Sequence, residues 1–440
     1  MGTWILVVAL VSEVGYTGYC LATRSRQRRI QGYLRIGALL AFVLLALISV
    51  IQWSFRWYIL AFLLFVWGVW GIWDLVRRPL ETAEFRPAGA IWRGVATLVL
   101  VMVAVTPGLI FPQFTLPPAT GGLPVSTALY SYTDTSRVET YTDTGAPREV
   151  NVEFWYPQDG GGPYPLIVFS HGTAGTKTSN ASTFMDLASH GYVVCSIDHP
   201  YQALITVDAS GSRVFVDRTY LQEFLDINNG KLDEATTFRI EQAWMDLRTA
   251  DINFVLDTVL EKAANPEQGS VYGLIDPTRI GLMGHSMGGA ATAEVARERT
   301  DVDAEVDLDA DLMGDYLAYA DGKYVMNDKP YPVPLLVVYA DDLVRLMDAI
   351  PDANEVVAVK RAAAVSDHVY QVHLEGTNHL SLTDVSLASP FLVSLVTAAV
   401  PKAGGQAVDS YATLQRMNGI VLNFFDSFLK GDGSFSVAGD

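Results

Sequence analysis

The residues best suited to chemistry surround Ser286, in the run Gly284-His285-Ser286-Met287-Gly288. This G-x-S-x-G spacing is typical of a nucleophile elbow, in which a strand turns sharply into a helix and exposes the serine hydroxyl. Apolar residues at 280–283 predict the strand, and the alanines after Gly289 predict the helix. Glycine is needed on both sides of the serine because a Cβ there would collide with backbone in so tight a turn. We therefore predict Ser286 as a nucleophile.

A serine hydroxyl needs a base to remove its proton, and that base is usually a histidine oriented by a carboxylate. With this kind of elbow the chain order is Ser, then Asp or Glu, then His. The histidines after Ser286 are His368, His373 and His379. His368 precedes the last predicted strand and His373 lies inside it, whereas His379 lies in the loop at its carboxyl end, where ligands bind in open α/β sheets. We predict His379 as the base.

Two positions are suitable for the acid. Asp309 closes a predicted strand at 304–308, and Asp341 or Asp342 closes the next one. Each position can point at the histidine, so the residues alone leave the choice open. Asp307 and Asp311 lie in an acidic run and are interpreted as solvated charges.

An oxyanion forms when the serine attacks a carbonyl, and backbone N–H groups must stabilise it. The template requires the N–H of the residue after the nucleophile, here Met287, and one from a loop after an early strand. Residues 170–175 form such a loop, and Thr173 is predicted as the second donor. His171 is expected to shape this loop. The glycines here are not a phosphate-binding loop, because its lysine and glycine spacing are missing.

Four apolar stretches precede the region of this site, at residues 3–22, 34–52, 58–76 and 91–111. Each is close to the length of about 20 residues that crosses a bilayer. They predict a transmembrane domain at 1–112, followed by a Pro- and Gly-rich linker at 113–125.

The arginines in the connecting loops predict the orientation of these helices. Arg24, Arg26, Arg28, Arg29 and Arg35 follow the first stretch, and Arg77, Arg78, Arg86 and Arg93 follow the third, whereas only Arg56 lies between the second and the third. By the positive-inside rule, the first and third loops are cytoplasmic. The chain is therefore expected to be a multi-pass protein of the cell membrane with an extracytoplasmic C-terminal domain.

The remaining chain predicts one catalytic domain at 126–434. Continuous apolar runs at 165–170 and 192–197 are typical of strands buried on both faces, and strands alternate with helices at 182–190, 240–262 and 411–429. This alternation favours a doubly wound, mostly parallel α/β sheet. The net charge of the whole chain is −18, and its acidic residues lie mostly after residue 112, which argues against a nucleic-acid partner. We expect no cofactor and no metal, and the oligomeric state stays open.

Several segments resemble a known family. Residues 164–172, 186–194, 284–289 and 308–310 resemble the platelet-activating factor acetylhydrolases of the plasma and intracellular type II kind, which are α/β-hydrolases. Residues 147–157 resemble that family's opening strands. The similarity covers about residues 117–430 in order.

The resemblance implies roles for particular residues. The family's acid lies in a Leu-Asp-Ala run after the elbow helix, which matches Asp309, and its oxyanion donors match Thr173 and Met287. The implied substrates are phospholipids with short sn-2 acyl chains. One departure is Asp311-Leu312-Met313, where the family usually has Trp-Met directly after Leu-Asp-Ala.

Residues 276–289 also resemble bacterial cutinase-like polyester hydrolases, whose acid follows the later strand and would match Asp341 or Asp342. We therefore expect a membrane-anchored serine esterase with the triad Ser286, His379 and Asp309. The alternatives are a broad carboxylesterase or polyester hydrolase and, from another class, a membrane receptor whose hydrolase-like domain only binds its ligand.

Overall fold

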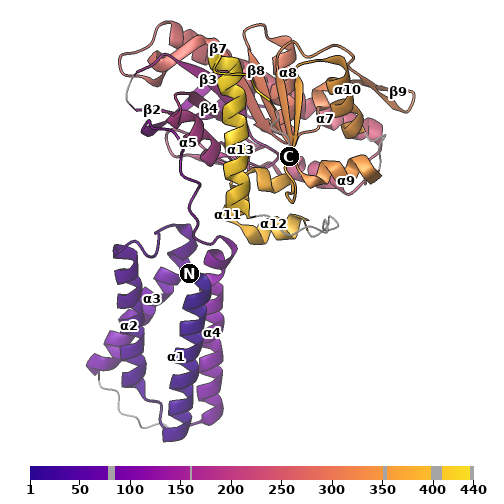
Figure 1. Ribbon diagram of the computed structural model, residues 1–440. Helices are drawn as coiled ribbons and strands as arrows, with labels where there is room; N and C mark the ends of the chain where they lie inside the picture. Colours follow the sequence, from indigo (N-terminus) through magenta and orange to yellow (C-terminus); the bar gives the residue numbers. More distant parts are fainter. Residues whose placement is uncertain (78–84, 159–160, 350–353, 398–408, 437–440) are drawn as a thin grey trace. The chain divides into compact units, whose positions relative to one another are not determined.

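The computed structural model describes residues 1–77, 85–158, 161–349, 354–397 and 409–436 (Figure 1). The chain forms two compact units. The first contains Met1–Thr115 and Leu387–Val400, and the second contains Leu116–Ser386 and Pro401–Asp440. The predicted domain limits at 112, 125 and 434 stay predictions, and the predicted cytoplasmic residue Arg78 lies outside the described residues.

Long helices build the first unit, and the prediction of four apolar N-terminal helices is confirmed. They are α1 (Gly2–Thr23), α2 (Arg28–Leu47), α3 (Tyr58–Arg77) and α4 (Pro87–Ile110). By length and composition, all four are able to cross a membrane. The short helix α12 (Pro390–Thr397) belongs to the same unit.

Glycines let α2 and α3 approach closely. A Cβ added at Gly32 would lie 3.0 Å from the carbonyl oxygen of Gly71, and a Cβ added at Gly71 would lie 2.8 Å from that of Gly32. Small residues at such a crossing are typical of helix pairs in membranes, where close backbone packing drives association.

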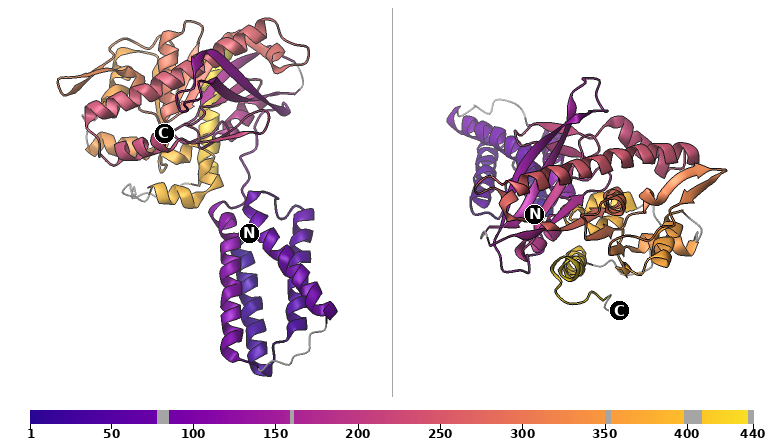
Figure 2. Two further views of the ribbon diagram at one scale, coloured as in Figure 1. Left: turned by 180° about the vertical axis from the view of Figure 1, so that it is seen from behind. Right: turned by 90° about the horizontal axis from the view of Figure 1, so that it is seen from above.

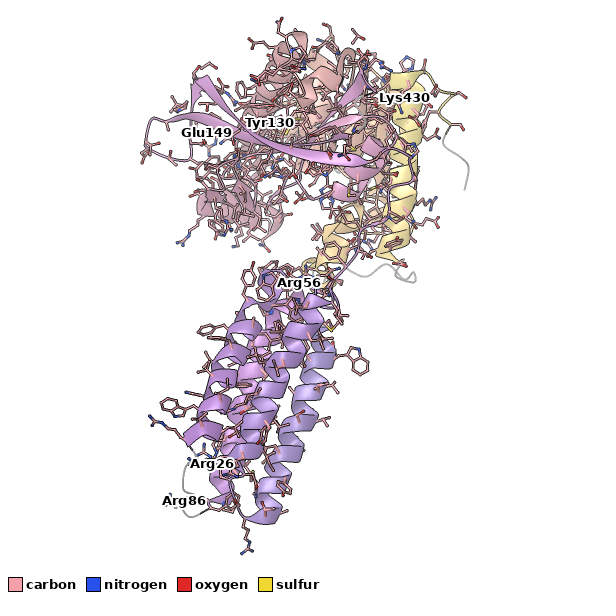
Figure 3. The ribbon with its side chains drawn as sticks, turned by 90° about the vertical axis from the view of Figure 1, so that its left-hand side faces the viewer. Arg26, Arg56, Arg86, Tyr130, Glu149 and Lys430 are labelled. Carbon is pink, nitrogen blue, oxygen red and sulfur yellow. The ribbon has the colours of Figure 1, made fainter. Side chains whose placement is uncertain are left out.

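The arginines are distributed unevenly along this helical unit. Arg26 and Arg86 lie at one end of the helices, and Arg56 lies at the other end (Figure 3). Arg26 and Arg86, which the sequence predicts to be cytoplasmic, therefore lie at the same end of the helices.

An eight-stranded, mostly parallel sheet forms the centre of the second unit, as the sequence predicts. Its strand order is β1-β2-β4-β3-β7-β8-β11-β12. Near one edge, β2 runs antiparallel to both of its neighbours, β1 and β4, and all other neighbouring strands are parallel. The strands are β1 (Val125–Val138), β2 (Pro147–Pro157), β3 (Tyr164–Ser170), β4 (Val193–Asp198), β7 (Ile275–His285), β8 (Ala304–Leu308), β11 (Leu335–Tyr339) and β12 (Val369–His373).

Helices cover both faces of this sheet, which is why its central strands are apolar on both sides. On one face, α7 (Glu234–Ala264) and α8 (Met287–Glu298) share a core with Val168 of β3. On the other face, the next residue, Phe169, lies against Phe184 of α5 (Ala181–Ser189), with ring centroids 4.8 Å apart. Figure 1 is viewed from the side of α13 (Ser410–Phe425), and the left view of Figure 2 is from behind.

Several elements around the sheet were not predicted. They are the hairpin of β5 (Ile205–Val207) and β6 (Arg213–Phe215), α6 (Arg218–Asn228), the hairpin of β9 (Tyr316–Ala320) and β10 (Lys323–Met326), α9 (Asp341–Ala349) and α10 (Asn354–Val365). Most of these elements are short, so their sequences contain too few residues to establish a period.

Candidate active site

Ser286 stands between β7 and α8 in a strained turn. Its φ is 55° and its ψ is −133°, a combination that a non-glycine residue rarely adopts. The turn is held because the Ser286 N–H donates to the Leu308 carbonyl on β8 at 3.0 Å. A Cβ at Gly284 would lie 2.3 Å from the Gly288 backbone, and a Cβ at Gly288 would lie 2.1 Å from the Ser170 carbonyl oxygen. The turn therefore requires glycine at both positions.

The structure brings His379 and Asp309 into contact. Asp309 follows β8, and its Oδ2 lies 2.7 Å from Nδ1 of His379, which begins a short 3-10 helix (His379–Leu382) after β12. The other carboxylate oxygen accepts a hydrogen bond from the Ala340 N–H at 2.8 Å. Both oxygens of Asp309 therefore have donors, and the histidine ring is fixed with Nδ1 toward the acid.

Burial and hydrogen bonding act in opposite directions on the charges of this pair. Burial would raise the pKa of Asp309, but the hydrogen bond from His379, its positive charge and the Ala340 N–H outweigh burial and lower that pKa. Burial would lower the pKa of His379, but the hydrogen bond and negative charge of Asp309 outweigh burial and raise that pKa above 6.5. A positive imidazole is therefore stabilised, as a base in acyl transfer requires.

Ser286 and His379 form no hydrogen bond in the described part of the chain. The ring of His285, next to the serine, lies tilted against that of His379 with ring centroids 4.6 Å apart, and its Nε2 donates to the His379 carbonyl at 3.0 Å. Ser286 is half-buried, and the His379 side chain keeps 38% of its surface exposed. The elbow and the imidazole are therefore adjacent, and in ligand-free enzymes the nucleophile-to-base contact is often long.

The carboxylates that competed for the role of the acid have other partners. Asp341 Oδ1 lies 2.8 Å from Nε2 of His373, and Asp342 accepts from the backbone N–H of His379 at 2.9 Å. Neither of them hydrogen-bonds the His379 ring. The interpretation of Asp307 as a solvated charge is wrong, because its side chain is fully buried and accepts from the Ala310 N–H at 2.8 Å.

Thr173 and Met287, the predicted oxyanion donors, lie beside each other. The Thr173 hydroxyl is 4.0 Å from the Met287 sulfur, and a Cβ added at Gly172 would lie 3.0 Å from the Ser286 Cβ. Among the described residues, neither backbone N–H has a hydrogen-bond acceptor. Two free amides therefore belong to residues beside the serine, one of them at the positive N-terminal end of α8.

Sequence reasoning missed a second Ser-His-Asp row. Ser170 Oγ lies 2.9 Å from Nε2 of His199, and Nδ1 of His199 lies 2.9 Å from Asp251. Ser170 ends β3 and His199 directly follows β4, and this position at the carboxyl ends of parallel strands is the sequence signal that could have indicated the row. This row has the hydrogen-bond order of a catalytic triad, but all three side chains are fully buried. Asp251 also binds Arg148 at 2.7 Å and Arg137 at 2.9 Å, so it is part of a buried ionic cluster.

Burial makes the Ser170 hydroxyl of this second row a poor nucleophile. Burial, partly opposed by Asp251, lowers the pKa of His199 to about 4, so that its imidazole is neutral. The Ser170 side chain has no accessible surface at which a substrate could reach its hydroxyl. Within the described residues, no group of three or more His, Cys, Asp or Glu side chains is placed to hold a metal ion.

The sheet order, the strained serine elbow and the histidine after the last strand define an α/β-hydrolase fold. The chain belongs to the family described as platelet-activating factor acetylhydrolase, isoform II, whose model matches residues 135–436.

Its relatives include several ester hydrolases. The chain is 32% identical to the platelet-activating factor acetylhydrolase of Canis lupus familiaris over 170 residues, which cover 34% of this chain and 36% of that protein. It is 30% identical to cutinase est1 of Thermobifida alba over 154 residues, 35% of this chain and 37% of that one. The matched stretch thus spans little more than a third of either relative.

A solved structure has the same fold. The ferulic acid esterase from Streptomyces cinnamoneus superposes with a TM-score of 0.54 at 21% identity, covering 74% of this chain and 96% of the esterase chain. At this identity, the superposition shows a shared fold.

Proposed function

We propose that this protein is a membrane-anchored serine esterase in which Ser286 is the nucleophile, His379 the base and Asp309 the acid that orients it. Ser286 Oγ attacks the ester carbonyl, and Nε2 of His379 accepts the hydroxyl proton. The Thr173 and Met287 N–H groups stabilise the tetrahedral oxyanion. His379 then protonates the leaving alcohol. In the second half of the reaction, His379 takes a proton from water, the water attacks the acyl group, and His379 returns the proton to Ser286 Oγ as the acid product leaves.

The observation that carries this proposal is the 2.7 Å contact between Asp309 and His379, which lies beside the strained elbow. It joins side chains 70 positions apart in the sequence at the carboxyl edge of the sheet, where reactive groups are expected. The raised pKa of His379 also supports the role of a base.

For the substrate, we propose phospholipids with a short sn-2 acyl chain. The family match and the relative from Canis lupus familiaris support an acetyl or similarly short acyl group. The match to cutinase est1 favours a second candidate, a broad carboxylesterase or polyester hydrolase. Activity on simple esters without activity on acetyl-phospholipid would favour this second candidate.

For the location, we propose a multi-pass protein of the cell membrane with an extracytoplasmic catalytic unit. The four helices able to cross a membrane and the arginines at one end of them support this orientation. Protease added to intact cells should cleave the catalytic unit. Full protection of that unit would contradict the orientation.

The test of the mechanism compares the two serines in the full-length protein in detergent micelles. A fluorophosphonate probe should label Ser286, and Ser286→Ala should abolish labelling and lower kcat on a short chromogenic ester by about 10⁴-fold or more. Ser170→Ala is the matched control and should still be labelled. Labelling lost with Ser170→Ala but kept with Ser286→Ala would assign the nucleophile to the buried row instead. A wild-type protein that the probe never labels would favour a receptor without catalysis.

A further inference from the structure

The loop that contains Thr173 rests on polar side chains with no surface exposed. His171, directly after β3, is fully buried, and so is Arg248 of α7 below it. Neither residue takes part in the mechanism proposed above. A buried imidazole and a buried guanidinium are costly unless their hydrogen bonds are satisfied, so the partners that they contact are informative.

Two contacts fix the His171 ring in one neutral form. Its Nδ1 lies 2.7 Å from the Gly172 carbonyl oxygen, which only accepts, so Nδ1 carries the proton. Its Nε2 accepts the His199 backbone N–H at 3.4 Å, so Nε2 carries none. Burial, followed by the nearby charge of Arg248, lowers the pKa of His171 well below 6.5, which agrees with a neutral ring.

The carbonyl that His171 holds is part of the Gly172–Thr173 peptide group. The N–H of this same peptide group is the predicted oxyanion donor. The hydrogen bond from His171, together with that from the Gly175 N–H to the same oxygen at 3.0 Å, fixes the plane of the peptide and polarises it, which strengthens the N–H as a donor. His171 therefore acts on Thr173 through a single peptide unit.

Arg248 restrains the loop on both sides of Thr173 through hydrogen bonds. One guanidinium nitrogen donates to the His171 carbonyl, and Nε donates to the Gln202 side chain at 2.7 Å. The Gln202 backbone carbonyl accepts the Ala174 N–H at 3.1 Å, and Ala174 has a φ of 52°. Among the described residues, no carboxylate forms an ion pair with Arg248. Its bonds go instead to the segments that hold the loop.

We propose that His171 and Arg248 are positioning residues that aim the Thr173 N–H at the oxyanion of the tetrahedral intermediate. This inference rests on the proposed function, because the Thr173 amide has this role only in acyl transfer. A positioning role differs from a purely structural role in one measurable consequence. Loss of the His171 hydrogen bond lowers transition-state stabilisation but leaves ester binding nearly intact.

Two amide substitutions separate the two ring nitrogens of His171. The side-chain nitrogen of asparagine lies about where Nδ1 lies, whereas that of glutamine lies about where Nε2 lies. His171→Asn thus keeps the donor to the Gly172 carbonyl, and His171→Gln loses it. Thr249→Ala, at the next position of α7 after Arg248, is the matched control for changes near this layer.

The measurements are kcat and KM on a short chromogenic ester and the affinity for a trifluoromethyl ketone, whose adduct places an oxyanion in the same hole. His171→Gln should lower kcat by about 10- to 100-fold, less than the loss of a whole donor, with KM changed by less than about threefold. Ketone affinity should fall by a similar factor. His171→Asn should recover most of both losses. Arg248→Gln should lower kcat and ketone affinity together, whereas Thr249→Ala should change neither.

Fluorophosphonate labelling separates this inference from the proposed function. If wild-type Ser286 is not labelled, the proposed function is wrong and the inference fails with it. If wild type is labelled and His171→Gln keeps wild-type kcat and ketone affinity, only the positioning role is wrong. An equal loss in His171→Asn and His171→Gln would also overturn that role. If either variant does not fold, Arg248→Gln decides by the same two measurements.

Discussion

Replacing Asp309 by asparagine should remove most of the catalytic activity while changing one atom of the side chain. In the wild type, one oxygen of Asp309 accepts the Ala340 N–H at 2.8 Å, and the other faces Nδ1 of His379 at 2.7 Å. An asparagine in the same place keeps its oxygen on the Ala340 N–H, because only the oxygen can accept. Its NH₂ group must then face the histidine.

The magnitude follows from the tautomer that this NH₂ group imposes. Facing a donor, Nδ1 must become an acceptor, so the proton of the neutral ring moves to Nε2. A protonated Nε2 cannot accept the proton of Ser286. In serine proteases, the corresponding change lowers kcat by about 10⁴-fold, which equals about 5 kcal/mol of transition-state stabilisation. We expect a loss of this order, with KM nearly unchanged.

The assay is the hydrolysis of a short chromogenic ester by the full-length protein between pH 5 and pH 9, with Asp341→Asn and Asp342→Asn as matched controls. Both controls should stay within about tenfold of wild type, because their carboxylates contact His373 and a backbone N–H rather than the His379 ring. Loss of the Asp309 charge should also lower the pKa of His379. The residual activity should therefore persist to lower pH than in wild type.

Two results would refute this reasoning. The first is an Asp309→Asn protein that keeps kcat within about tenfold of wild type, since the orientation of His379 would then not depend on this carboxylate. The second is a loss of about 10⁴-fold in Asp342→Asn or Asp341→Asn, which would assign the acid to the later strand, as in cutinase-like enzymes.

Three further predictions concern the pH profile and the stability of the fold. In wild type, kcat/KM should fall as pH drops through a pKa above 6.5, because Asp309 raises the pKa of His379 and a protonated imidazole accepts no proton. A fall in kcat/KM on the acidic side that is centred below pH 6.5 would contradict this. Burial and neighbouring acids raise the pKa of Glu294 to about 7. The contribution of this carboxyl to the stability of the fold is therefore fully present below pH 4.5, where it is protonated, and is lost as pH rises through 7. Glu294→Gln should therefore raise the free energy of unfolding at pH 8 by on the order of 2 kcal/mol and not at pH 4; an equal gain at both pH values would argue against the carboxylate as the cause. Gly288→Ala should prevent accumulation of folded protein, because its Cβ would lie 2.1 Å from the Ser170 carbonyl oxygen, whereas Gly419→Ala, with no atom within 4 Å, should be tolerated in thermal unfolding.

Short-range patterns were enough to predict the elements that hold the candidate nucleophile and base. The strand and the helix around Ser286 follow from apolar runs and from glycines that the turn requires, and both signals lie within a few residues of the serine. The position of His379 after the last strand followed from chain order. The four apolar N-terminal helices were predicted from length and hydropathy, which are also local quantities.

The tertiary structure alone decided which side chains meet. A carboxylate after β8 reaches His379, and one after β11 reaches His373, because the order β8-β11-β12 and the exact loop after each strand determine where each side chain points. The same reason explains the buried row of Ser170, His199 and Asp251, whose members are 29 and 52 positions apart. Local sequence sets the conformation of each strand and helix, but a hydrogen bond between distant residues depends on how those elements are ordered in the sheet, and no short window of sequence contains that order.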